Sequence, residues 1–201
     1  DKIGLERDAS GFVFSVQHFL PGLTGTRYLD DWAVNDFMVD QEGNGWLATN
    51  DQGLIHFTIN NRGTAGPLIN FNYEEQSPYS IANTIIVKLF QDRSGVIWIG
   101  TNKGVSKYVP SKNRFSEVTV PESFQTKQND AILAVLCDSK QRVWLAWDSD
   151  KLAVLKNDRG RDVLKDKEEL PGVFSGLDQV NALFESRKGD IYIGTLLNGL
   201  Y

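Results

Sequence analysis

Asp, Gly and Trp recur at fixed spacings along the 201-residue chain, and two of these side chains could do chemistry. A carboxylate can act as a general acid or base, and an indole can stack on a sugar ring. A glycoside hydrolase needs two carboxylates within about 5–10 Å of each other. Asp40, Asp92 and Asp138 instead occur once per repeat, 46 to 52 residues apart. We therefore interpret these carboxylates as parts of turns and not as an acid–base pair.

The recurring unit is Asp-x-x-Gly-x-x-aromatic, and it is present in four copies. The aromatic residue is Trp46, Trp98, Trp144 or Tyr192. In the third copy Gln141 replaces the Gly, and in the fourth Ser186 replaces the Asp. An Asp followed three residues later by a left-handed Gly is typical of a tight turn, in which the carboxylate accepts hydrogen bonds from backbone amides.

Short apolar runs on both sides of each turn indicate the elements that position these residues. Residues 86–90 and 96–100 are examples, and both have the length of a strand. A third strand is expected after a loop that ends in Gly, and a fourth near 69–73 and 114–120. Four antiparallel strands per copy make a propeller blade, and the spacing fits the roughly 40–50 residues of one blade. The sequence predicts an all-β fold, a β-propeller of four-stranded antiparallel blades.

The full pattern, Asp-x-x-Gly-x-x-Trp-(Ile/Leu)-(Gly/Ala)-Thr followed by Gly and an aromatic residue, resembles the two-component regulator propeller repeat. Residues 92–108 match it nearly throughout, and the resemblance covers roughly residues 30–201. The third copy departs from the pattern at Gln141, Trp147 and Lys151. A fainter earlier copy has Asp8, Gly11 and Phe14 in the same register.

These copies divide the chain into blades of one propeller domain fragment. We expect a degenerate or partial first blade at 1–33, blades at 34–81, 82–128 and 129–176, and a partial last blade at 177–201. The resemblance implies a seven-bladed ring, which four to five blades cannot close. The remaining blades of the same polypeptide are therefore expected to lie against this segment.

The resemblance also implies a function, that of the periplasmic sensor region of a hybrid two-component system regulator. Such a sensor responds to an oligosaccharide, forms a homodimer, and belongs to a full-length protein with a membrane span and a histidine kinase. The segment itself is then non-enzymatic. Two alternatives remain at this point: a secreted carbohydrate-active propeller enzyme, either a lyase or a hydrolase, and a propeller scaffold that binds a protein.

Composition and charge argue against several further functions for this segment. A net charge of −5 argues against nucleic-acid contact, which needs clustered Lys and Arg. No segment approaches the roughly 20 apolar residues of a membrane span, so none is expected here. The single Cys137 cannot form an internal disulfide, and nothing places metal-ligand partners near His18 or His56. We expect no cofactor, no metal site and no catalytic residue in this segment.

The best candidates for ligand binding lie in the loops that follow the aromatic strand, because these loops differ between copies while their flanks stay alike. We expect them to share a face with the starts of the innermost strands. Trp147, which replaces a Thr, would form an exposed indole beside Asp148, a pair suited to sugar stacking and hydroxyl hydrogen bonds. The alternative is that Trp147 fills space beside a smaller neighbour. The candidate ligand-binding residues are Trp147, Asp148, Asn50, Asp51, Asn102, Lys103, Asn198 and Trp32.

Overall fold

The computed structural model of the chain describes residues 2–8, 11–17, 33–61, 65–118, 131–148, 152–158, 161–164 and 178–201. In this part of the chain the secondary structure is almost entirely β. The exception is one short 3-10 turn, η2 (Pro110–Lys112). No helix in the described part is long and apolar enough to cross a membrane.

Three four-stranded antiparallel sheets form the centre of the structure, and the strands of each pair in chain order. The first sheet contains β3 (Val34–Val39), β4 (Gly45–Thr49), β5 (Leu54–Phe57) and β6 (Ile69–Phe71). The second contains β7 (Ile86–Gln91), β8 (Ile97–Thr101), β9 (Gly104–Val109) and β10 (Arg114–Val118). The third contains β11 (Ile132–Cys137), β12 (Arg142–Trp147), β13 (Leu152–Asp158) and β14 (Arg161–Leu164).

Two further hairpins complete the described elements. One pairs β15 (Val180–Glu185) with β16 (Ile191–Thr195), and the other pairs β1 (Lys2–Asp8) with β2 (Gly11–Gln17). In the second hairpin Asp8 lies opposite Gly11, at the ends of the two strands. The repeated four-stranded antiparallel sheets confirm the predicted all-β propeller fold.

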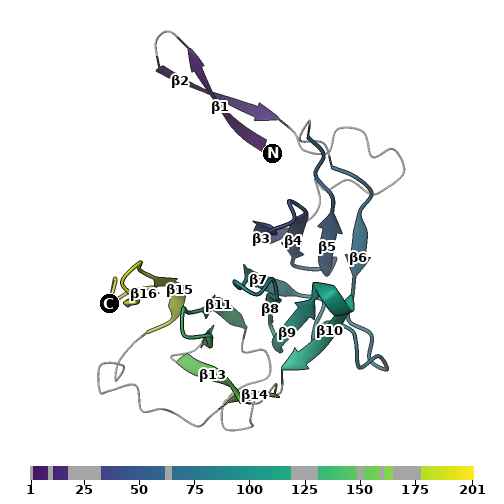
Figure 1. Cartoon of the computed structure of the whole chain (residues 1–201), viewed down its shortest axis with the longest axis vertical. Coiled ribbons are helices and arrows are strands. Elements are labelled where there is room, and N and C mark those ends of the chain that lie inside the picture. Colours follow the sequence, from purple (N-terminus) through teal and green to yellow (C-terminus); the bar gives the residue numbers. More distant parts are fainter. Residues whose placement is uncertain are drawn as a thin grey trace.

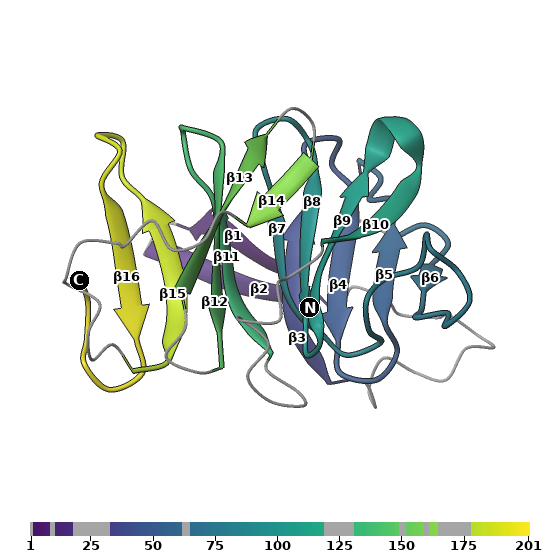
Figure 2. The same cartoon turned by 90° about the horizontal axis from the view of Figure 1, so that it is seen from below.

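Figure 1 shows how the sheets are arranged. The inner strands β3, β7, β11 and β15 gather on one side, while β6, β10 and β14 fan outward. Figure 2 shows that the strands run between two ends of the stack. We call one end the turn face, formed by residues 40–44, 92–96, 138–142 and 186–190 together with η2. The opposite end is the loop face, formed by residues 50–53, 102–103, 148 and 196–199.

Apolar clusters between neighbouring sheets hold the stack together. Trp46 of β4 is buried with Ile97 of β8 in one cluster, and Trp98 of β8 is buried with Leu145 of β12 in another. The backbones approach closely at the small residue two positions after each aromatic residue. A Cβ atom on Gly100 would lie only 3.0 Å from Ile132 Cγ2 of the next inner strand. The repeated Gly or Ala at this position therefore follows from blade packing.

Each inner strand contains an irregularity in its pairing, one or two residues after its start. In β3 the side chains at this point reach the next inner strand. Asn35 Nδ2 donates to Ile86 O at 2.7 Å, and the carboxylate of Asp36 accepts the Leu89 amide at 3.0 Å. Lys88 forms an ion pair with Asp36 at 3.0 Å. The bulge thus directs polar groups of one blade onto the backbone of its neighbour.

The two flanks of the stack carry exposed apolar side chains. Phe37 of β3 is 48% exposed, and Phe184 of β15 is 64% exposed. Between the first, second and third sheets, by contrast, the apolar side chains are covered by the neighbouring blade. That further blades cover these flanks stays a prediction.

Candidate functional site

The repeated Asp carboxylates form the centre of each turn on the turn face. Asp92 Oδ1 accepts the backbone amides of Ser94 at 2.9 Å and Val96 at 3.1 Å. Its other oxygen accepts the indole N–H of Trp98 at 2.9 Å. The six-residue spacing therefore places a buried indole donor directly against the carboxylate that organises the turn.

The same arrangement occurs in two other copies. The indole of Trp46 donates to Asp40 at 2.8 Å, and that of Trp144 donates to Asp138 at 2.9 Å. In the fourth copy both members change together. There the hydroxyl of Ser186 accepts backbone amides of the turn, and Tyr192 replaces the Trp. Carboxylates saturated in this way are poorly suited to general acid–base catalysis, because proton transfer needs a free lone pair.

Hydrogen bonding also sets the charge state of these carboxylates. Partial burial raises the pKa of Asp40, but bonds from Trp46 and from the turn residues Asn44 and Glu42 outweigh it and lower the pKa below 3.8. Burial acts in the same way on Asp138, where the bonds from Trp144 and Arg142 prevail and lower its pKa. Both groups are anionic at neutral pH.

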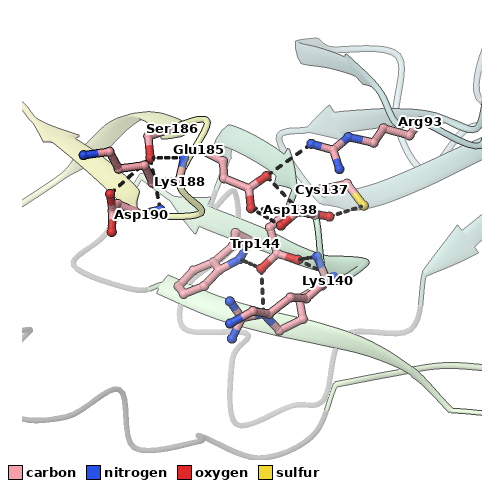
Figure 3. A network of polar contacts seen from close by, with 11 residues as sticks. Arg93, Cys137, Asp138, Lys140, Trp144, Glu185, Ser186, Lys188 and Asp190 are labelled. Carbon is pink, nitrogen blue, oxygen red and sulfur yellow. Dashed lines mark hydrogen bonds and ion pairs between the residues drawn. The ribbon is translucent and has the colours of Figure 1, made fainter.

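A polar network joins the turns near the inner strands on the turn face (Figure 3). Glu185, at the end of β15, accepts the Ser139 amide at 2.8 Å and lies 3.6 Å from the guanidinium of Arg93. The hydrogen bonds from the hydroxyl and the amide of Ser139 lower the pKa of Glu185, and the charge of Arg93 acts in the same direction. Gln91 makes the equivalent contact between the first and second sheets, because its side chain accepts the Gln41 amide at 2.7 Å. In both cases the side chain of the residue before the Asp position of one turn accepts the backbone amide of the residue after the Asp position of the adjacent turn. We call this contact a clasp.

The junction between the second and third sheets lies between these two clasps, and it has no Gln or Glu at the corresponding position. Cys137 occupies the position of Gln91 and Glu185. Burial, followed by the charges of Asp92 and Asp138, raises the pKa of its thiol to about 11. A thiol with this pKa is protonated at neutral pH, the form that is a poor nucleophile.

On the loop face, the repeated Thr organises each loop. The hydroxyl of Thr101 donates to Gly104 O at 2.9 Å and accepts the Lys103 amide at 3.1 Å. Thr49 and Thr195 make the equivalent bonds to Gly53 and Gly199.

These loops also bond to the segments that lead into the inner strands. The Asn50, Asn102, Asp148 and Leu196 amides donate to the carbonyls of Ala33, Ile85, Ala131 and Gln179, respectively. The expectation that the loops share a face with the starts of the innermost strands is confirmed.

The expected exposure of Trp147 is wrong. Its side chain is 3% exposed and packs in the apolar cluster between the second and third sheets, with Ile132 as its cross-strand partner. The alternative, that the indole fills space beside a smaller neighbour, agrees with this burial. Trp147 therefore presents no surface for sugar stacking in this structure.

Most of the other candidates on the loop face are exposed to solvent. Asp148 is exposed and accepts a hydrogen bond from the side chain of Gln179. Asn50, Asp51, Lys103 and Asn198 are exposed, and Asn102 is half-buried with its side-chain oxygen unbonded. Trp32 lies outside the described residues. The structure thus brings Asp148 next to Gln179, and none of the described candidate residues lines either of the two grooves on the turn face.

Concave sites are found instead on the turn face, between neighbouring blades. A groove of about 470 Å³ lies between the first and second sheets, and we call it groove 1. Its lining includes Asp40, Glu42, His56 and Tyr108. Groove 2, of about 290 Å³, lies between the second and third sheets and includes Asp92, Arg93, Lys107 and Asp138. Neither groove was predicted from the sequence, although the residues between the Asp and the Gly of each turn differ between copies, as the loop residues do.

No group of three or more His, Cys, Asp or Glu side chains gathers as metal ligands among the residues that the structure describes.

Comparison with protein families supports the motif analysis. Residues 80–103 match the model of the family described as two component regulator propeller. The matched segment contains the turn of Asp92, Gly95 and Trp98. Within residues 80–103 this match confirms the resemblance that the motif indicated.

Solved structures with the same fold include the extracellular domains of two hybrid two component systems from B. thetaiotaomicron. One has a TM-score of 0.60 and 18% identity, and the match covers 83% of this chain and 21% of that one. The other has a TM-score of 0.64 and 14% identity, over 98% of this chain and 25% of that one. The chain therefore spans a quarter or less of the length of these structures.

A gluconolactonase from Xanthomonas campestris has the same fold. Its TM-score is 0.55 at 12% identity, and the match covers 81% of this chain and 56% of that one. Likeness at such identities shows the fold alone. No curated protein matches the sequence significantly.

Proposed function

We propose that this chain is part of the extracytoplasmic, ligand-sensing propeller of a membrane-spanning hybrid two-component signalling protein. The match of residues 80–103 to the two component regulator propeller model carries this proposal. The fold shared with extracellular domains of hybrid two component systems supports it. On this proposal the segment is not an enzyme, and the full-length protein carries the membrane span and the histidine kinase.

The ligand of this proposed sensor is an oligosaccharide, and the loop face is its binding side. Exposed hydroxyl-binding groups support this choice, namely the amides and carboxylates of Asn50, Asp51, Asp148 and Asn198. Because Trp147 is buried, an aromatic platform must come from elsewhere. Ligand binding would then bias the packing of two copies in a homodimer, and this bias would reach the kinase.

The enzyme alternative is less well supported by the described residues. It requires a free acid and a free base that converge, whereas Asp40, Asp92 and Asp138 are each saturated by their own turn and indole. The shared fold with a gluconolactonase does not favour catalysis here, because the fold hosts many functions.

The proposal is tested by calorimetric titration of the intact protein with a panel of neutral and charged oligosaccharides. We expect one of them to bind without being cleaved, and Asp148→Asn with Asp51→Asn to weaken that binding. Product formation from any saccharide would favour the enzyme alternative. Capture of a specific protein partner with no saccharide bound would favour the scaffold.

A further inference from the structure

Groove 1 and groove 2 occupy equivalent positions in consecutive blade pairs, so one serves as an internal comparison for the other. Each has a repeated Trp at its base, Trp46 in groove 1 and Trp98 in groove 2. Each also has the cross-strand partner of that Trp in its lining. The partner of Trp46 is His56, and the partner of Trp98 is Lys107. Among the differences between the two linings, one therefore falls at a matched position beside the indole, His56 in groove 1 and Lys107 in groove 2.

Groove 2 carries a cation of its own. The ammonium group of Lys107 lies 5.9 Å from the centre of the Trp98 ring, within the range of a cation–π contact. Arg93 adds a second positive charge to the lining, which also contains Asp92 and Asp138. The charges of these four side chains balance, so the groove is neutral without any ligand.

Groove 1 has the carboxylates without the cation. Asp40 and Glu42 belong to its lining, and no Lys or Arg is present among the described residues that line it. His56 lies against Trp46 with ring centres 4.2 Å apart, in place of the lysine. Partial burial lowers the pKa of His56 despite the nearby charges of Asp40 and Glu42, so the imidazole is neutral at pH 7. The groove is therefore an anionic pocket at neutral pH.

The free charge in this pocket is that of Glu42. The Asp40 carboxylate is occupied by the Trp46 indole and by the turn amides. The Glu42 carboxylate makes no hydrogen bond or ion pair with any residue that the structure describes. The ring of Tyr108 lines the same space, 5.4 Å from that of Trp46. An unpaired carboxylate beside aromatic rings suits an ammonium group, which gains both a counter-ion and a π face.

We propose that groove 1 binds an organic cation through a primary ammonium group, with Glu42 as its counter-ion and the rings of His56 and Tyr108 as its walls. The volume of about 470 Å³ admits the body of a small ligand as well as its amine. This site lies on the turn face, away from the loops of the proposed saccharide site, and it does not depend on that proposal. Two sources offer this chemistry, an amino sugar and the side chain of a lysine.

Calorimetric titration of the intact protein with two matched pairs of probes tests the proposal. One pair is glucosamine and N-acetylglucosamine, and the other is Nα-acetyl-lysine amide and its Nε-acetylated form. We expect the charged member of at least one pair to bind about tenfold more tightly than its uncharged partner, which is the size of one strong ionic contact. The pair that shows the larger ratio identifies the source.

Two variants place the effect in groove 1. Glu42→Gln removes the counter-ion, and His56→Lys installs the cation that groove 2 carries at the matched position. Each should lower the affinity for the charged probe about tenfold, as expected for one ionic contact. Glu75→Gln makes the same charge change on an exposed loop residue outside the groove and should leave the affinity unchanged. Equal affinities for both members of both pairs, or full binding by Glu42→Gln, would overturn the proposal.

Discussion

At the scale of single residues, the repeated carboxylate and the repeated indole depend on each other. Asp92 binds its own turn through one oxygen and the Trp98 indole through the other. Asp40 and Asp138 do the same with Trp46 and Trp144. Where Ser186 replaces the Asp, Tyr192 replaces the Trp, so the two positions change together within one chain. The pair is thus a structural unit that fixes the hairpin to the core.

Removal of the carboxylate should therefore cost stability well beyond the turn. We expect Asp92→Ala to lower the free energy of unfolding by about 3 kcal/mol, because a buried indole N–H and two turn amides lose their acceptor. Urea unfolding measures this change. The control, Asp51→Ala on the exposed loop, should stay within about 0.5 kcal/mol of the parent. Equal effects of the two substitutions would contradict the role given to the Asp–Trp pair.

The third turn contains a conformation that its residue type does not favour. Gln141 has φ 58°, whereas the Gly residues at the matched positions have φ of 85–88°. We expect Gln141→Gly to raise the free energy of unfolding by about 0.5–1 kcal/mol, since the strain of a left-handed side chain outweighs the entropy cost of Gly.

The second turn allows the opposite substitution, from Gly to a residue with a side chain. Gly95→Ala should lower the free energy of unfolding by about 1 kcal/mol through backbone strain alone, because the added Cβ would have no neighbour closer than 3.8 Å. Thermal unfolding followed by circular dichroism measures both variants. A loss of stability in Gln141→Gly would show that the strain assigned to this turn is absent.

At the scale of elements, the blades are coupled by close contact as well as by apolar burial. Gly100→Ala would place a Cβ 3.0 Å from Ile132 Cγ2 and 3.1 Å from Ile132 O. We expect this substitution to cost about 1–3 kcal/mol of unfolding free energy, as overpacking does. In an Ile132→Ala background part of this cost should disappear, and a double-mutant cycle measures the difference. Strict additivity of the two changes would argue against a contact at this point.

The turns also make stability depend on pH. The folded state lowers the pKa of Asp40 and Asp138 below 3.8, so their stabilisation is complete above that value and is lost as the pH falls through the folded pKa. We expect the urea midpoint to decline slightly as the pH falls below about 6.5, because folding lowers the pKa of His56, and to drop more steeply below about pH 4 as Asp40 and Asp138 become protonated. Asp138→Asn should reduce this drop, and an unchanged acid limb would contradict the assignment.

Much of this architecture can be predicted from the sequence, because turns and strand alternation are local. The Asp-x-x-Gly spacing predicts the hairpins. The loop after each aromatic strand lies, as predicted, on the same face as the starts of the inner strands. The burial of Trp147 could not be predicted in this way, since it depends on packing against a neighbouring sheet. The Asp–Trp bond was missed as well, although the joint change at Ser186 and Tyr192 is a signal for it.

At the scale of the whole molecule, the two ends of the stack have different characters. The loop face carries exposed amides and carboxylates on loops held by Thr hydroxyls, as at Thr101. The turn face carries turns held by Asp carboxylates, blade-to-blade contacts such as that between Glu185 and Ser139, and the two grooves. Each groove is lined by residues of two neighbouring blades, so a ligand in it would touch both blades at once. Binding can therefore alter the relative positions of blades and not just one loop, which is what a sensor requires.

The most direct test of the proposed sensor function is autophosphorylation of the intact protein in lipid vesicles, with and without candidate oligosaccharides. We predict that one saccharide changes the rate of phosphate incorporation about fivefold or more, in the range of ordinary allosteric coupling. The saccharide should remain intact during the reaction. An intact protein that incorporates no phosphate, or one whose kinase ignores every saccharide while the propeller cleaves one of them, would contradict the account.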